Sequence, residues 1–300
     1  MTLLEIHEPG QTPRPHTDED AAVGIDLGTT NSLVAYSTGG KPEVLRQGRD
    51  GKSLMPSVVA YLDGAEPVVG EDARVHLLEN PNRVVSSVKR LMGRGAHDVK
   101  ALAGSLPYEI ESGPETDSRE RMVRLRVAGR TLTPVEISAA ILGGLRERAE
   151  RALGTKVTRA VVTVPAYFDD AARTATRDSA RLAGLEVLRL VNEPTAAAVA
   201  YGLDQKAEGL YAVYDLGGGT FDISILRMQM GVFQVVATGG DAALGGDDFD
   251  YAIAERFLAE RTAEFGEQNP TPGEIKLVLS TARIAKECLT GQDSGTWHVE

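Results

Sequence analysis

The first strongly patterned segment of the chain is a short apolar run over residues 21–26, closed by an acid and followed by Gly28. Strand-forming residues resume over 33–36. This pattern predicts two strands joined by a tight turn. The preceding residues 1–20 carry prolines, a glycine and an acidic run but few apolar residues, so we expect a disordered leader there.

Helical and strand patterns alternate along the middle of the chain. One helix begins at Thr133, which can cap it, with Pro134 in the first turn and Glu136 in capping-box register. A nearly continuous apolar run follows, which is typical of a strand buried on both faces. The succession predicts an α/β layered domain, with helices over 133–153, 169–183 and 194–201 and strands over 157–164 and 185–191.

A second strand–turn–strand pattern follows a boundary near residues 205–209. It predicts strands over 210–215, 221–226 and 232–238, helices over 249–265 and 274–289, and strand-like residues at 297–300. We therefore expect two lobes. Lobe I covers 21–206, with an outer subdomain of about 56–130; lobe II covers 207–300, with an outer subdomain from about residue 247.

The charge balance excludes some classes of partner. The 300 residues include 43 acidic and 32 basic side chains, a net charge of −11. Such a chain is a poor nucleic-acid binder, because phosphate contacts need clustered Lys and Arg. It has no apolar run of about 20 residues and no secretory signal, and its single Cys288 excludes an intrachain disulfide. We expect a cytoplasmic protein without nucleic-acid or membrane partners.

One short motif occurs twice, 189 positions apart, at the start of each expected lobe. GIDLGTTNS and VYDLGGGTFD are both apolar strands that end in Asp-Leu-Gly, with Thr beyond the glycines. Backbone N–H groups of a glycine turn can converge on phosphate, and an acid beside phosphate is favourable when hydrated Mg²⁺ lies between them. Either hairpin alone is an ordinary turn, but together they predict two loops that clamp one nucleotide. Neither is a P-loop or a G-x-G-x-x-G fingerprint.

Three other residues are candidates that the pattern alone leaves open. Glu193 in NEPTAAA starts a helix, where a carboxylate is stabilised, and the alternative is simple capping. Lys89 in SSVKRLMGR is either functional or an ordinary solvated lysine. Asp241 lies in a glycine-rich stretch that we expect to be a ligand-facing turn, with an ordinary loop as the alternative.

Six segments, in family order over about residues 22–290, resemble the ATPase domain of DnaK-type heat-shock chaperones. They are GIDLGTTNS, VKRLMGR, VVTVPAYFDDAAR, RLAGLEVLRLVNEPTAAAVAYGLD, YDLGGGTFDISIL and GGDAALGGDDFD. LLEIHEPG and GVFQVVATGGDAALGGDDFD are most similar to the HscA branch, which serves iron–sulfur cluster assembly. The resemblance implies an α/β, actin-like fold with a nucleotide cleft between two lobes.

The resemblance also implies roles for individual residues. The expected nucleotide-binding residues are Gly28, Thr29, Thr30, Asn31, Gly217, Gly218, Gly219 and Lys286, the last on the adenine side. The expected catalytic residues are Lys89, which places the attacking water, Glu193, Asp215 and Thr220. Asp26, Glu193 and Asp215 would surround Mg²⁺ and its waters, Asp222 would hold K⁺, and Pro165 and Arg173 would relay the nucleotide state. Near the adenine, Glu287 and Thr290 replace a customary Arg and Ser, which predicts weaker nucleotide retention.

The implied activity is ATP binding and hydrolysis to ADP by a monomeric chaperone. Its implied partners are an HscB-like J-domain co-chaperone and an iron–sulfur scaffold protein as client. The alternatives are a general DnaK-type chaperone, a truncated non-catalytic docking fragment, or a sugar or acetate kinase, which the match through VPAYFDDAAR and NEPTAAA disfavours. The resemblance also predicts that lobe II is incomplete in this chain and therefore labile.

Overall fold

The computed structural model describes residues 21–46, 51–95, 99, 109–110, 123–203, 208–241, 244–266 and 270–294. The expected leader over 1–20 and the strand-like residues 297–300 lie outside the described residues. None of the helices in these ranges combines the length and apolarity that a membrane span requires.

A mixed sheet forms the centre of lobe I, with its strands in the order β12-β11-β1-β2-β3. The two pairs β1–β11 and β11–β12 are parallel, whereas β2 runs antiparallel to β1 and β3. The strands are β1 (Ala21–Asp26), β2 (Asn31–Thr38), β3 (Lys41–Val44), β11 (Val157–Val164) and β12 (Glu186–Asn192), and β4 (Met55–Pro56) also pairs with β2.

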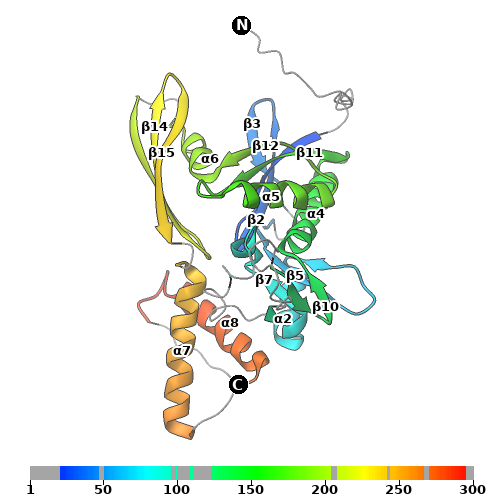
Figure 1. The fold of residues 1–300 in the computed structure, drawn as a ribbon, viewed down its shortest axis with the longest axis vertical. Helices are drawn as coiled ribbons and strands as arrows, with labels where there is room; N and C mark the ends of the chain where they lie inside the picture. Colours follow the sequence, from blue (N-terminus) through cyan, green and yellow to red (C-terminus); the bar gives the residue numbers. More distant parts are fainter. Residues whose placement is uncertain are drawn as a thin grey trace.

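Helices α4 (Pro134–Leu153) and α5 (Asp170–Leu182) pack against each other and against strands of this sheet (Figure 1). The predicted capping box of α4 is present, because Thr133 and Glu136 exchange side-chain and backbone hydrogen bonds. The buried face of α4 joins strand residues in one apolar core, which includes Ile25, Val34, Leu91, Ile137, Ile141, Leu145 and Val162. This core fixes the ends of β1 and β11, where polar side chains begin.

The outer part of lobe I is built from short elements. One small sheet contains β5 (Val58–Ala60), β6 (Val68–Val69) and β7 (Val84–Ser86); another contains β8 (Glu109–Ile110), β9 (Leu125–Val127) and β10 (Arg130–Leu132). Around them lie helices α1 (Glu71–Arg74) and α2 (His76–Glu79) and the 3₁₀ turns η1 (Pro81–Arg83) and η2 (Val88–Leu91). The η2 turn begins after Ser87, a non-glycine residue with φ of 55°. It carries Nζ of Lys89 to within 2.7 Å of Oε1 of Glu193.

The described residues of lobe II form a three-stranded antiparallel sheet and two helices (Figure 1). They are β13 (Gly209–Leu216), β14 (Phe221–Gln229), β15 (Val232–Asp241), α7 (Gly246–Phe265) and α8 (Pro272–Cys288). Ala254, Val278 and Ala282 are buried where α7 packs on α8. Helix α6 (Glu193–Ala200) contacts strands of both lobes, and α8 contacts α2 and η1.

The predicted α/β class is confirmed, and the helices and strands predicted within the described residues are present with small shifts of their ends. One prediction needs correction: Asp241 lies at the edge of the predicted turn and not inside it. It ends β15, opposite Phe221 in the β14–β15 ladder, and its carbonyl accepts the N–H of Leu244 at 3.5 Å. The glycine-rich run could not reveal how far β15 extends, because Gly239 and Gly240 pair as strand residues.

Candidate functional site

The two glycine loops predicted from the sequence lie directly against each other. The first glycine loop (residues 27–30) joins β1 to β2, and the second (217–220) joins β13 to β14. A Cβ on Gly218 would overlap Oγ1 of Thr30, and one on Gly219 would overlap Cγ2 of Thr29. Glycine is therefore required for this approach of the two lobes, and an occupant between the loops would have to move them apart.

Buried hydroxyl groups shape the first glycine loop. The N–H of Gly28 donates to Oγ of Ser32 at 3.2 Å, and Ser57 Oγ donates to the Gly28 carbonyl at 2.8 Å. A Cβ on Gly28 would overlap the carbonyl oxygen of Asn31. Oγ1 of Thr30 is buried with no hydrogen-bond partner among the described residues. This hydroxyl could donate to an anion, as the sequence predicts for a phosphate loop.

Acidic side chains gather around the ends of β1, β13 and α6. Asp26 ends β1 and accepts a hydrogen bond from Thr163 Oγ1 at 2.7 Å. Asp215 of β13 lies opposite Asp222 of β14 in the ladder. Burial raises the pKa of Glu193, and the charges of Asp26 and Asp215 raise it further. These carboxylates repel one another, so a cation among them would relieve the repulsion.

Lys89 reaches one of these carboxylates from the η2 turn in the outer part of lobe I. Its Nζ lies 2.7 Å from Oε1 of Glu193, and the two side chains are only 12% and 19% exposed. This pairing lowers the pKa of Glu193, in opposition to the burial. Lys89 is thus not a solvated surface lysine, and Glu193 has a partner beyond any capping role.

Thr220, Asp222 and Tyr167 complete the acidic side of the site. Thr220 Oγ1 donates to Oδ2 of Asp222 at 2.9 Å. Burial is the main cause that raises the pKa of Asp222, and the charge of Asp215 adds to it. Although Tyr167 is 39% exposed, desolvation and then the charge of Asp222 raise its pKa to about 12. We define the acidic cavity as the hollow that Pro165, Tyr167, Glu193, Asp215 and Asp222 help to line.

The donor set fits a hydrated cation better than a directly ligated one. Among the described residues, no three acidic, His or Cys side chains are grouped closely enough to hold a metal ion directly. Mg²⁺ usually keeps several of its waters and takes only one or two protein carboxylates. The pKa values of Glu193 and Asp222, which burial and neighbouring carboxylates raise, fit this mode of binding.

The two expected relay residues lie at one loop. Pro165 follows β11 and lines the acidic cavity. Arg173 of α5 donates from Nε to the Phe168 carbonyl at 2.9 Å and from Nη2 to Oδ1 of Asn192 at 2.9 Å. Because Asn192 precedes Glu193, Arg173 connects the loop after β11 to the start of α6.

Lys286 lies beside the second glycine loop. Its Nζ donates to the Gly246 carbonyl at 2.5 Å and pairs with Oδ1 of Asp250 at 2.6 Å. The backbone at the start of α7 in turn contacts the loop, because Gly246 donates to the Gly217 carbonyl at 3.0 Å. Lys286 therefore orders the residues that support the loop.

Contacts between the lobes include residues that the sequence did not single out. Ser87 Oγ donates to Oδ2 of Asp247 at 2.6 Å, and Arg90 Nη2 lies 2.6 Å from Oδ2 of Asp248. The only sequence signals were the basic run in VKRLMGR and the acids in GGDDFD. Both contacts tie the η2 turn, and with it Lys89, to the start of α7.

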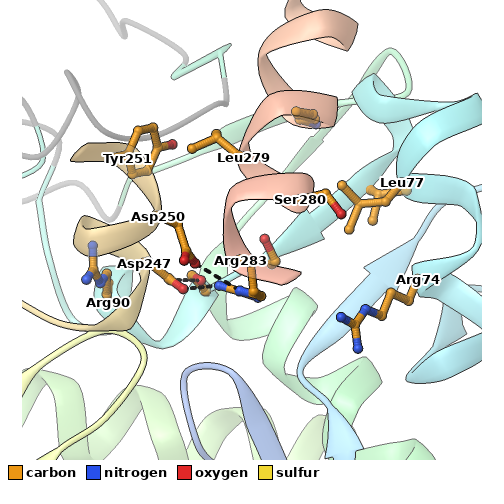
Figure 2. A pocket seen from close by; sticks show the side chains of 13 residues that line it. Arg74, Leu77, Arg90, Asp247, Asp250, Tyr251, Leu279, Ser280 and Arg283 are labelled. Atoms are coloured by element: carbon orange, nitrogen blue, oxygen red, sulfur yellow. Dashed lines mark hydrogen bonds and ion pairs between the residues drawn. The ribbon is translucent and has the colours of Figure 1, made fainter. Parts of the chain in front are cut away.

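A separate cavity of about 100 Å³ lies between the outer part of lobe I and helices α7 and α8 (Figure 2). Arg74 and Leu77 line one side of it, and Tyr251 and Leu279 line the other. Arg283 of α8 pairs there with Asp247 and Asp250. None of the site residues predicted from the sequence lines this cavity.

We predict that Arg90 and Asp248 are energetically coupled across the lobes. Their side chains are 3% and 21% exposed, and removing one partner of a nearly buried pair leaves the other charge uncompensated. A double-mutant cycle with Ala should give a coupling of about 1–3 kcal/mol in the free energy of unfolding. The exposed pair Arg256–Glu260 is the matched control, with about 0.5 kcal/mol or less expected. Equal coupling in both pairs would contradict the prediction.

Comparison with known proteins gives a family match over almost the whole chain. The model of the Hsp70 protein family matches residues 22–292. Proteins called "Chaperone protein HscA homolog" are similar: that of Bordetella petrii is 56% identical over 290 residues, 97% of this chain and 44% of the relative. That of Bordetella pertussis is 55% identical over 300 residues, 100% of this chain and 46% of the relative. That of Pseudomonas putida is 54% identical over 305 residues, which cover 100% of this chain and 47% of the relative.

The chain thus spans less than half the length of these curated relatives. The matched region includes both glycine loops, the Lys89–Glu193 pair and the start of α7. The similarity to the HscA branch and the actin-like fold class, both expected from the sequence, are confirmed. The chain belongs to the Hsp70 family.

Proposed function

We propose that this chain binds and hydrolyses ATP as the nucleotide-binding part of an HscA-like chaperone. The observation that carries the proposal is the Lys89–Glu193 ion pair, which lies among acidic side chains beside two facing glycine loops. A cation, a group of carboxylates and two phosphate-type loops are the parts that phosphoryl transfer requires. The family match supports the same activity.

In this proposal, the glycine loops hold the phosphate chain through their backbone N–H groups. Gly28, Thr29, Thr30 and Asn31 form one side, and Gly217, Gly218, Gly219 and Thr220 form the other. The buried hydroxyl of Thr30, which lacks a partner within the described part of the chain, supports this role. Lys286 would support the adenine side, where Glu287 and Thr290 favour weaker retention of the nucleotide.

The carboxylates would hold cations through water. Asp26, Glu193 and Asp215 would surround Mg²⁺, and Asp222 with Thr220 would hold K⁺. When bound, Mg²⁺ neutralises charge on the phosphates. Lys89 would orient the attacking water and stabilise the charge that develops on the transferred group, while Glu193 holds Lys89 in place.

The loop after β11 is suited to report the nucleotide state. Pro165 lines the acidic cavity, and Arg173 connects the same loop to Asn192 beside Glu193. A change at Glu193 would therefore move a loop at the end of β11. In the whole protein, that loop would pass the change to a peptide-binding region.

The partners belong to the proposal for the whole protein, because the chain spans less than half of its curated relatives. We propose a cytoplasmic chaperone that works with an HscB-like J-domain co-chaperone on an iron–sulfur scaffold protein. The name "HscA homolog" of the similar proteins supports this choice over a general folding chaperone.

We predict that the full-length protein binds ATP in a Mg²⁺-dependent manner. Calorimetry should show at least about tenfold weaker binding in excess chelator, or about 1.4 kcal/mol. Asp26→Asn should reduce this Mg²⁺ dependence, whereas Asp63→Asn, at a side chain 83% exposed, should not. Equal affinity with Mg²⁺ and chelator would contradict the metal role, and no ATP binding at all would favour a docking role.

A further inference from the structure

A cationic cavity lies next to the acidic cavity and shares Tyr167 with it. Its volume of about 180 Å³ is far above the roughly 10–15 Å³ that one water needs. Its walls come from residues 89–90 and 92–94 in and after η2, residues 167–169 after β11, Ala172 of α5 and Thr220 of the second glycine loop. Both lobes therefore contribute to it, beside the Lys89 that we propose acts at the γ-phosphate.

The charges of the two cavities are opposite. The acidic cavity is lined by three carboxylates and no Lys or Arg. The cationic cavity has one carboxylate, that of Asp169, and three cations, those of Lys89, Arg90 and Arg94. Asp169 already accepts the N–H of Ala172 at 2.8 Å as the cap of α5. Lys89 and Arg90 are already paired with Glu193 and Asp248, so Arg94 supplies the positive charge that is left for an anion.

One of the cations, Arg94, has hydrogen-bonding capacity to offer. Arg90 pairs with Asp248 through its terminal nitrogens, and its buried Nε lies against Gly219 of the second glycine loop. No acidic side chain among the described residues pairs with Arg94. A charged hydrogen bond from its guanidinium to an anion in the cavity would be a strong one.

Tyr167 lies at the boundary between the two cavities. Its pKa of about 12 keeps the phenol protonated at neutral pH, and its hydroxyl is hydrogen-bonded to the side chain of Thr220. Apolar side chains of Met92, Phe168 and Ala172 close the rest of the wall. The mixture suits a small tetrahedral oxyanion held by the guanidinium group of Arg94.

We propose that the cationic cavity binds inorganic phosphate at a site separate from the γ-phosphate position. The proposal rests on the proposed function, because hydrolysis of ATP would release phosphate beside Lys89, at the wall of this cavity. Arg94 is the residue that tests it, since its side chain belongs to the cavity and to none of the catalytic roles above. The site would hold the product after it leaves the nucleotide.

The test is a ³¹P NMR titration of inorganic phosphate into the full-length protein saturated with Mg²⁺ and a non-hydrolysable ATP analogue. The analogue occupies the γ position, so phosphate that still binds must bind elsewhere. Arg94→Gln should weaken phosphate binding at least about tenfold, the loss of one charged hydrogen bond. Arg94→Lys keeps the charge and should retain most of the binding.

Arg124 provides the matched control. It is exposed, does not line the cavity, and follows Val123, whose N–H donates to the Arg94 carbonyl at 3.1 Å. Arg124→Gln should leave phosphate affinity within about twofold. Absence of phosphate binding to the saturated wild type, or equal binding by Arg94→Gln, would overturn the proposal.

Failure of the proposed function gives a different result. Binding of the analogue is measured first, and its absence counts against nucleotide binding rather than against the cavity. The phosphate titration is then run on the nucleotide-free protein. There, weaker phosphate binding by Arg94→Gln than by Arg124→Gln would support the proposal, and equal binding by the two variants would overturn it.

Discussion

Replacing Lys89 by Ala in the full-length protein should slow single-turnover ATP hydrolysis by about 10²–10³-fold, the usual effect of losing one group that stabilises transition-state charge. Nucleotide affinity should change by about threefold or less, because the loops bind the phosphates with backbone groups. Lys52→Ala is the control, since Lys52 pairs with Glu71 at the surface, where their side chains are 59% and 47% exposed. Its hydrolysis rate should match that of the wild type.

The Ala variant also leaves Glu193 buried without its cation, which raises the pKa of that carboxyl further. A second variant, Lys89→Met with Glu193→Gln, removes both charges and so avoids an unpaired one. It should remain folded, as thermal unfolding will show, and remain slow. Hydrolysis by Lys89→Ala within about threefold of the wild type would mean that Lys89 serves only to neutralise Glu193.

The second large effect is on stability, at Gly93. Its φ is 71°, and a Cβ there would overlap backbone atoms of Ala172 at the start of α5. Gly93→Ala should therefore lower the free energy of unfolding by about 2–6 kcal/mol, from backbone strain of about 1–3 plus overpacking of about 1–3. Urea unfolding monitored by circular dichroism measures this change.

Gly129→Ala isolates the contact from the backbone conformation. Gly129 has a φ of 73°, and its added Cβ would meet no atom within 4 Å. In this control, backbone strain alone should lower the free energy of unfolding, by about 1–3 kcal/mol. If both variants lose the same free energy, α5 shifts to accept the methyl group and the close packing of Gly93 on Ala172 is not a constraint.

Local signals in the sequence were sufficient to predict most elements of the fold. In the capping boxes at Thr133 and Thr271, the Thr and a Glu three residues later hydrogen-bond each other's backbone N–H groups. The starts of α4 and α8 could therefore be predicted without tertiary information. The continuous apolar run of β11 likewise indicated a central strand. Asp241 was misplaced because glycines also pair in ladders, and only the partner strand β14 settles that.

The site was predictable where chemistry demands a residue type and not where it depends on distant contacts. The glycine loops could be found because only glycine permits their approach to Thr29 and Thr30. The Ser87–Asp247 contact joins residues 160 positions apart, and no local pattern reports it. The left-handed conformation of Ser87 was equally hidden, since few non-glycine residues adopt it.

The strand order of lobe I has a consequence for synthesis on the ribosome. The β1–β2 hairpin is local, but the other edge of β1 pairs with β11, where Val23 lies opposite Ala160. At roughly 5–20 residues per second, the nascent chain would expose that apolar edge for roughly 7–28 s before β11 is made. An unpaired apolar edge invites pairing with other chains. A protein of a chaperone family would therefore itself need protection during its own translation.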